Sequence, residues 1–446
     1  MSATRRLAEF IHDLRYEDIS KDAIGKARLC LMDWVGVTVG GYVNGRNDMD
    51  SMVDAVSPFF GQPQATLITK KRKCDVINAA LINGTASHYL DYDDVHTGMV
   101  GHPSVPVIPA ALAMGEHREI NGKKLVEAIV AGFEAECRIG EAVNPDHYAA
   151  GWHATATLGC FGSCAAVAKM IGLSVDKVVS SLGIAGTQAS GVQQSIGTMC
   201  KPFHAGKAAS NGILAAVLAE NGFTAPQQIL EGTGGFGKVL SQKFDETKLN
   251  DFGRPFEIEA VLYKRYASCY FTHATVRCML GIREKHRPAL SKVTSVTVKA
   301  SSVTCTIAGN PDPQTGLEGK FSVRYCAAVA LMRGTVIESD FTNESVREPE
   351  IRDLMSRIKV VQDESLGLTE AEIHTKMTDG TEIKERLELV SKEAGVSVAE
   401  WESVLETKSS DLLQGAFPSK TADRIAAAIR ELEKIGNIKT FVELLS

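Results

Sequence analysis

The chain has 446 residues, and its 48 Lys and Arg against 54 Asp and Glu leave a net charge of −6 at pH 7. A weakly acidic chain without blocks of like charge lacks the basic face of a nucleic-acid binder. Its 44% hydrophobic and 23% charged residues exclude global disorder. The apolar runs are shorter than the ~18 residues that a membrane span needs, so we predict no membrane association.

The N-terminal region and the cysteines point to a compartment. The first residues, MSATRRLAEFIHDL, lack the apolar core of a secretory signal. Ten cysteines are scattered along the chain, mostly in apolar helical contexts, and we interpret them as reduced, buried thiols. Together these features predict a cytoplasmic protein.

Residues 1–256 have a helical pattern. After Ser20, a plausible helix cap, apolar side chains recur at helical spacing, at Ile24, Ala27, Leu31 and Trp34. A later helix rich in small residues is predicted to stop at Asn221-Gly222. The run Thr224-Ala-Pro-Gln227 predicts the start of a further helix, with Thr224 as its cap.

The pattern changes near residue 257. A β-branched run predicts a strand over 292–299, and Asp379-Gly380 between two alternating runs predicts a hairpin over 372–384. Helical spacing returns over 321–334, and again after 395, where Ser419 or Thr421 is a candidate cap. We therefore predict a mainly α protein: a large all-helical domain formed by both chain ends, residues 1–256 and 395–446, with a smaller inserted α+β lid domain, residues 257–394.

The segment 87–104 is the first candidate for chemistry. It gathers His88, Asp91, Asp93, Asp94, His96 and His102. Its part from Gly98 to Pro103 is predicted to be a loop, and loops on a rigid scaffold often carry working residues. Carboxylates beside imidazoles suit acid–base chemistry near neutral pH. A metal site and purely structural caps or ion pairs are the alternatives, but no H-E-x-x-H or C-x-x-C pattern supports a metal.

Three further segments carry polar side chains in suggestive places. His153 follows a glycine-flanked turn at a predicted helix start, where neutral imidazole is favoured. Lys201 and His204 precede an apolar helix, and Pro202 is expected to keep Lys201 out of helical geometry. Lys264, Tyr266 and Ser268 lie at the junction of the two patterns and could bind carboxylates. Each set also has a structural explanation as caps, solvated lysines or interdomain packing.

A literal G-x-G-x-x-G match at residues 232–237 is set aside. A dinucleotide-binding fingerprint needs a preceding strand, and we expect a helix there.

The ordered set of motifs resembles the MmgE/PrpD family. The motifs are Asp91-Tyr-Asp-Asp94, Gly101-His-Pro-Ser104, Gly151-Trp-His153, Lys201-Pro-Phe-His-Ala-Gly206, Lys264-Arg-Tyr-Ala-Ser-Cys269, Thr272-His-Ala274 and Lys320-Phe-Ser322. The resemblance covers essentially the whole chain. It implies a homodimer, an active site between the two domains, and action on di- or tricarboxylates without metal or organic cofactor. Members of the family act as 2-methylcitrate dehydratase, cis-aconitate decarboxylase or iminodisuccinate epimerase.

The resemblance also implies site residues. The family's aspartate corresponds to Asp91, its loop histidine to His102, its second histidine to His153 and its lysine to Lys201. One departure weighs against decarboxylation: Val95 stands where the decarboxylase branch has threonine, and the spacing from Asp91 to His102 is one residue longer.

We therefore predict a cofactor-independent lyase that dehydrates 2-methylcitrate or a citrate-like hydroxy acid. His102 and His153 would be the acid–base pair, in an order that the sequence leaves open, and Asp91 would orient an imidazole or bind the substrate hydroxyl. Lys201 would hold carboxylates. Further substrate contacts are assigned to His96, Thr97, His204, Lys264, Tyr266 and Ser268. Epimerisation and decarboxylation remain alternatives for the same groups, and a metal-dependent hydratase or an inactive helical scaffold are alternatives of other classes.

Overall fold

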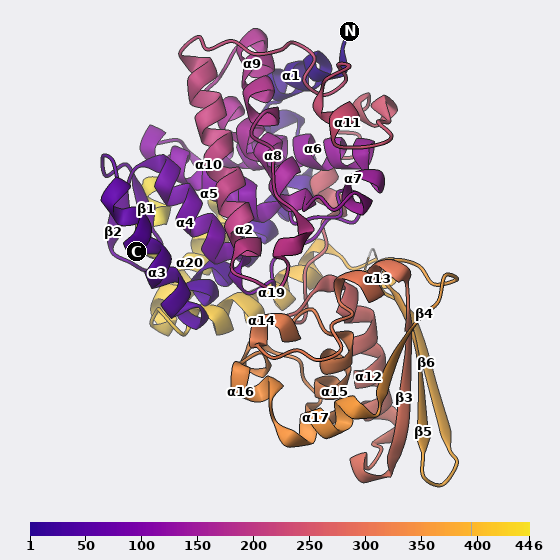
Figure 1. Ribbon diagram of the computed structural model, residues 1–446. Coiled ribbons are helices and arrows are strands. Elements are labelled where there is room, and N and C mark those ends of the chain that lie inside the picture. Colours follow the sequence, from indigo (N-terminus) through magenta and orange to yellow (C-terminus); the bar gives the residue numbers. More distant parts are fainter. Residues whose placement is uncertain (394) are drawn as a thin grey trace. The chain divides into compact units, whose positions relative to one another are not determined.

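The computed structural model describes residues 1–393 and 395–446. Within these residues the chain separates into two compact units, residues 1–263 with 397–446 and residues 264–396. The predicted domain boundary at residue 394 lies outside the described residues. The mainly helical class is confirmed (Figure 1). One large helical unit is built from both chain ends, and the residues between these ends in the sequence form a smaller α+β unit.

The first unit is a bundle of packed helices with a buried core of small and aliphatic side chains. Its long helices are α1 (Ala3–Asp13), α2 (Lys21–Asn44), α3 (Arg46–Val56), α4 (Val76–Tyr89), α5 (Ser104–Arg118), α6 (Gly122–Val143), α8 (Ala154–Met170), α9 (Val175–Gly186), α10 (Cys200–Glu220), α19 (Val398–Leu413) and α20 (Ser419–Arg430). A short hairpin, β1 (Ala65–Leu67) with β2 (Arg72–Cys74), is the strand pair of this unit. The predicted cap of α2 is confirmed, because Ser20 accepts a hydrogen bond from the amide of Ala23.

Helix α10 lies against both α4 and α8, and two glycines allow this close approach (Figure 1). A Cβ on Gly206 would come within 2.0 Å of the carbonyl oxygen of Leu81 on α4. A Cβ on Gly212 would come within 2.0 Å of Oγ of Ser163 on α8. Because no side chain fits at either position, α10 can pack directly on the two helices that carry the histidines described below.

The C-terminal segment supports the loop that follows α4. Helix α19 packs on α2, and its Lys408 lies 2.6 Å from Asp33 of that helix. The Lys408 ammonium also donates to the carbonyl of Tyr92 at 2.5 Å and lies 3.8 Å from the centre of the Tyr92 ring. Residues far apart in the sequence therefore fix the backbone beside Asp91.

Three local expectations are wrong. No helix starts at Thr224. The amide of Phe236 instead donates to the carbonyl of Ile229 and closes a glycine-rich turn. The G-x-G-x-x-G match at 232–237 is therefore preceded by a turn and not by the expected helix. Lys201 lies in the first turn of α10, where a proline at the next position is tolerated since the first amides of a helix need no internal partner. Helix α20 begins after Pro418 without a side-chain cap from Ser419 or Thr421.

The second unit is a four-stranded sheet with helices on it. The strands are β3 (Val293–Ala300), β4 (Ile358–Gln362), β5 (Glu370–Met377) and β6 (Glu382–Glu388), in the order β4-β3-β5-β6. Only β3 and β4 are parallel. Helices α12 (His273–His286) and α15 (Val323–Arg333) contact the sheet, and α17 (Pro349–Ser356) packs on α15 (Figure 1). The predicted strand near 292–299 and the hairpin at Asp379-Gly380 are confirmed.

The remaining elements are short. They are α7 (Asp146–Ala149), α11 (Phe236–Val239), α13 (Ser302–Ile307), α14 (Gly316–Gly319), α16 (Asn343–Val346), α18 (Leu389–Glu393), α21 (Lys439–Val442) and several single 3₁₀ turns. In the described part of the chain, no helix combines the length and the apolar character that crossing a membrane demands.

Candidate active site

The loop between α4 and α5 begins at Asp91, which ends α4 in the left-handed region with φ of 51°. Its amide donates to the carbonyl of His88 at 3.2 Å, as in helices that stop with a left-handed residue. Aspartate tolerates this conformation better than most residues. The helix end therefore places the side chains of His88 and Asp91 next to each other, both buried.

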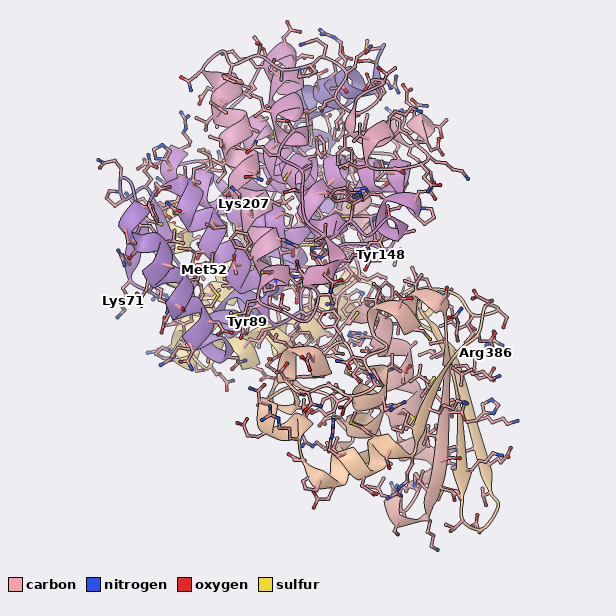
Figure 2. The ribbon with its side chains drawn as sticks, in the orientation of Figure 1. Met52, Lys71, Tyr89, Tyr148, Lys207 and Arg386 are labelled. Atoms are coloured by element: carbon pink, nitrogen blue, oxygen red, sulfur yellow. The ribbon has the colours of Figure 1, made fainter. Side chains whose placement is uncertain are left out.

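Lys201 enters this place from the first turn of α10. Its ammonium donates to Oδ1 of Asp91 and lies 3.0 Å from Nε2 of His88. Figure 2 marks Tyr89, the last residue of α4, and Lys207, one turn and a half along α10 from Lys201, so the two helices can be followed there. Although Lys201 is only 5% exposed, it is paired with a carboxylate, as a buried cation must be.

Asp93 joins two histidines. Its carboxylate oxygens lie 3.0 and 2.9 Å from Nδ1 of His88, and Oδ2 lies 3.0 Å from Nδ1 of His102. Burial by itself would raise the pKa of Asp93, but the neighbouring His88 and His102 hold it well below the ordinary value. Burial, reinforced by Lys201, lowers the pKa of His88 to about 3 despite the opposing effect of Asp93. An ionised Asp93 thus faces a neutral His88.

His102 presents its other nitrogen toward Asp91. Its Nδ1 lies 2.8 Å from the carbonyl oxygen of Asp94, which can only accept, so Nδ1 carries hydrogen. When the ring is neutral, Nε2 therefore holds the lone pair, and it lies 4.0 Å from Oδ1 of Asp91. The backbone amide of His102 donates to Oγ1 of Thr155 at 3.2 Å, which ties the loop to α8.

The Asp94 side chain anchors this loop to α5. Its Oδ1 accepts from the amide and the hydroxyl of Ser104 at 3.2 and 2.8 Å, in the first turn of α5. Burial raises the pKa of Asp94 to about 8, and the negative charges of Asp33 and Asp93 add to the effect.

His153 precedes the first residue of α8, as predicted, and it belongs to the same cluster. Its ring stacks on that of His88 with centroids 6.0 Å apart. Its Nδ1 lies 3.0 Å from Nδ1 of His204, on α10. Burial, with Lys201 and the neighbouring imidazoles, holds the pKa of His153 well below its ordinary value, and burial and Lys201 also lower that of His204.

The structure thus brings together five of the predicted site residues: Asp91, His102, His153, Lys201 and His204. His96 uses its ring elsewhere: Nδ1 accepts from the amide of Met99 at 3.1 Å and Nε2 lies 3.0 Å from Glu257. Thr97 lies in the turn of this loop, where its carbonyl accepts from the amide of Val100. The predicted substrate contacts of His96 and Thr97 stay predictions.

The other three predicted residues belong to the second unit. Lys264 is fully buried. The Tyr266 ring lies 5.0 Å from that of His273, centroid to centroid, and burial raises its pKa. Ser268 exchanges a hydrogen bond of 2.9 Å with Thr272. Their assignment to substrate carboxylates stays a prediction.

His88 and Asp93 are the members of the cluster to which the sequence assigned no role. Both lie in the segment 87–104, so the local density of acids and imidazoles was the available signal. Residue type alone does not rank six neighbouring side chains, because their arrangement in space depends on where α4 ends.

A metal ion could in principle use His88, Asp91 and His102, whose potential ligand atoms lie within 4.8 Å of one another. The Lys201 ammonium, however, already contacts two of the three residues. A divalent cation there would meet a fixed positive charge, so the donor set fits a lysine better than a metal.

Comparison with known families finds a match for each of the two parts of the chain. The MmgE/PrpD N-terminal domain matches residues 5–248, and the MmgE/PrpD C-terminal domain matches residues 266–434. The chain belongs to the MmgE/PrpD family.

Curated relatives span most of the chain. A cis-aconitate decarboxylase of Aspergillus terreus is 26% identical, with 99% of this chain and 96% of that protein covered. The cis-aconitate decarboxylase of Mus musculus is 25% identical over 86% of this chain and 82% of its own. A mitochondrial 2-methylcitrate dehydratase of Yarrowia lipolytica is 24% identical over 98% and 89%.

Proposed function

We propose that this protein is a lyase of polycarboxylates that dehydrates 2-methylcitrate or a citrate-like hydroxy acid by acid–base chemistry. The observation that carries the proposal is the buried group formed by Nε2 of His102, the Asp91 carboxylate and the Lys201 ammonium. It unites a base with a defined tautomer and a fixed cation. Membership of the MmgE/PrpD family supports the substrate class, since its relatives are named for citrate-like acids.

In this proposal His102 is the base. Its Nδ1–H faces the Asp94 carbonyl and the Asp93 carboxylate, which stabilise the imidazolium formed when Nε2 takes a proton from the carbon next to a carboxylate. That proton then passes to the departing hydroxyl, which leaves as water. His153, surrounded by Lys201 and other imidazoles, stays neutral and donates a hydrogen bond to a substrate oxygen.

Lys201 supplies the charge that the reaction needs. Removal of a proton beside a carboxylate places negative charge on its oxygens, and an ammonium already held in a buried place stabilises that charge without reorganisation. We propose that Lys264, Tyr266 and Ser268 bind the other carboxylates, since an ammonium and two hydroxyls are suitable partners for them.

Decarboxylation of cis-aconitate is the second candidate. It is favoured by the relatives of that name, one of which covers 99% of this chain. The same groups could protonate the carbon left after loss of CO₂. Against it stands Val95, which the resemblance aligns with a threonine of the decarboxylase branch. Val95 is buried, and its amide and carbonyl pair with those of Leu262.

The test is a proton NMR time course in D₂O with EDTA present, using 2-methylcitrate, citrate, cis-aconitate and iminodisuccinate. A new vinylic signal from a hydroxy acid supports dehydration, and a product of cis-aconitate with release of CO₂ supports the second candidate. Deuterium exchange without net conversion supports epimerisation. Inactivity with EDTA that Zn²⁺, Mg²⁺ or Fe²⁺ restores would contradict the metal-free proposal, and silence from all four substrates would contradict the substrate class.

We also propose a cytoplasmic homodimer. Ten cysteines without disulfides support a reducing compartment. Val192 and Met199 precede α10 and Phe203 lies in its first turn; all three are exposed apolar side chains, which supports a covered surface there. Light scattering should give twice the 48.0 kDa of one chain, and a mass of one chain at micromolar concentration would contradict the dimer.

A further inference from the structure

We propose that His88 and Asp93 are positioning residues: Asp93 fixes the tautomer of His88, and Nε2 of His88 then holds the Lys201 ammonium against Asp91. The inference rests on the proposed function, in which Lys201 binds a substrate carboxylate. Neither residue has been assigned a role by the family motifs, and neither is required to touch substrate.

Hydrogen-bond chemistry defines the direction of each contact. A lysine ammonium only donates, so Nε2 of His88, 3.0 Å from Nζ of Lys201, accepts. The ring hydrogen is therefore on Nδ1, which faces both oxygens of Asp93 at 2.9 and 3.0 Å. One tautomer of one ring satisfies an anion at one end and a cation at the other.

Burial makes this arrangement rigid. The side chains of His88 and Asp93 are 0% exposed and that of Lys201 is 7% exposed. With its pKa lowered to about 3 by burial and by Lys201, His88 stays neutral near pH 7 and cannot exchange protons with a substrate. It can, however, serve as a constant acceptor for the ammonium, and a preorganised charge is what stabilises an anionic transition state.

Asp93 contacts His102 as well, but the two histidines depend on it differently. Nδ1 of His102 also has the Asp94 carbonyl at 2.8 Å as an acceptor. Both contacts of Nδ1 of His88 are with Asp93 itself. A change at Asp93 should therefore disturb His88 and Lys201 more than the tautomer of His102.

The first variant is Asp93→Asn, in which an N–H₂ donor replaces one acceptor oxygen. His88 can then take the other tautomer, with its Nε2–H directed at the Lys201 ammonium. We expect kcat/KM to fall ~10-fold or more, through both kcat and KM, because Lys201 binds a substrate carboxylate and also stabilises the charge that develops on it. An unchanged kcat/KM in the folded variant would contradict the inference.

Glu116→Gln is the matched control. Glu116 is also a buried carboxylate with several donors: it accepts from the amide and hydroxyl of Thr66 and from Lys73. We expect this variant to lose stability without a change of KM. An equal rise of KM in both variants would show that loss of any buried carboxylate has the same effect.

A second pair of variants tests the acceptor itself. Glutamine can offer an oxygen to Lys201, whereas leucine cannot, so His88→Gln should retain at least ~10-fold more kcat/KM than His88→Leu. Equal activities in two folded variants would overturn the role of Nε2.

The deciding experiment needs no substrate. In protein labelled with ¹⁵N-histidine, the signal absent from His88→Gln identifies His88, and its shifts report the tautomer. We expect a neutral ring with hydrogen on Nδ1 from about pH 5.5 to 8.5, and a changed tautomer in Asp93→Asn. Hydrogen on Nε2, or protonation near pH 6.5, would overturn the inference. Inactivity of the wild type on every substrate would instead refute the proposed function and leave this result standing.

Discussion

Nδ1 of His153 lies 3.0 Å from Nδ1 of His204, and burial lowers the pKa of both rings. Two neutral imidazoles can form such a contact only when one Nδ1 carries hydrogen and the other does not. The tautomers are therefore coupled, and in the proposed function His204 determines which nitrogen of His153 can donate to a substrate. The predicted direct contact of His204 with substrate stays a prediction.

Removal of His204 should therefore reduce kcat through His153. We expect His204→Ala to lower kcat ~10-fold, and His204→Asn, which retains a donor and an acceptor on its side chain, to recover part of the loss. Steady-state kinetics measure both. Lys207→Ala is the control, since Lys207 is an exposed residue of the same helix and should leave kcat unchanged (Figure 2). Equal kcat for His204→Ala and wild type would refute the coupling.

His102→Ala tests the proposed base directly. Loss of a general base usually costs about 10²-fold or more in turnover. We expect that fall in kcat with a circular dichroism spectrum close to that of the wild type, because the loop stays attached through the backbone amide at Thr155. The Tm should fall modestly, since the ring is only 14% exposed and its removal takes a partner from the buried Asp93. Near-normal kcat in the folded variant would assign the base elsewhere.

Gly206→Ala tests the packing that brings Lys201 to α4. Its Cβ would lie 2.0 Å from the carbonyl oxygen of Leu81, so α10 must move away. We expect a loss of roughly 1–3 kcal/mol in the free energy of unfolding, as for other overpacked cores, together with a lower kcat/KM. Urea unfolding and kinetics measure the two effects.

Gly234→Ala serves as the comparison for this variant. It lies in the same unit, and an added Cβ meets nothing within 4 Å, so both quantities should stay near the wild type. A Gly206→Ala protein as stable as Gly234→Ala would show that α10 is not held as closely as described.

Periodicity and turn residues predicted the classes of element well. The strand at 292–299, the hairpin at Asp379-Gly380 and the start of α8 after His153 all follow from local patterns. The same rules fail where local chemistry is ambiguous: Pro202 predicts that Lys201 lies outside a helix, although a proline also fits the first turn of one.

Part of the candidate site could be predicted from residue type and from the family resemblance, rather than from periodicity. Asp91, His102, His153 and Lys201 stand out by residue type and family resemblance. The contacts of His88 with Asp93 and with Lys201 depend on the left-handed end of α4 and on two glycines of α10. No local sequence pattern predicts these two features.

Asp94 makes stability depend on pH in a definite direction. Burial, Asp33 and Asp93 raise its pKa to about 8, above the ~3.9 of an unfolded chain. The folded protein therefore keeps a proton that the unfolded chain loses. The stability that this contributes is complete below about pH 4 and is lost as the pH rises toward 8.

Asp94→Asn removes that dependence because an amide resembles the protonated acid. The stability of the variant relative to wild type should rise between pH 4.5 and 8 in urea unfolding. Asp75→Asn should change in the opposite sense and at lower pH: although burial opposes it, hydrogen bonds from Gly61 and Asn78 lower the pKa of Asp75, so this variant should differ little from pH 4.5 to 8 and gain stability relative to wild type only below about pH 4. A difference between Asp94→Asn and wild type that is independent of pH would contradict the raised pKa.

Glu136 offers the clearest route to a more stable protein. It is 0% exposed on α6, and neither carboxyl oxygen has a hydrogen-bond partner among the described residues. Burial, with a contribution from Asp94, holds its pKa well above the ordinary value and so favours the neutral acid, whose O–H has no partner among the described residues. Such a group costs about 1–3 kcal/mol.

Glu136→Met should recover much of this cost, because methionine has a similar unbranched shape and no polar atom to satisfy. The close approach of Gly162 supports the choice of an unbranched side chain. A Cβ added to Gly162 would lie 2.6 Å from the carboxyl of Glu136, so there is little room for branching. Glu136→Gln is the matched variant: it keeps an unsatisfied amide and should gain nothing. Thermal unfolding at pH 7 compares the Tm of the two variants. A lower Tm for Glu136→Met than for Glu136→Gln would mean that the carboxyl has a bound partner, such as a water molecule, that methionine displaces.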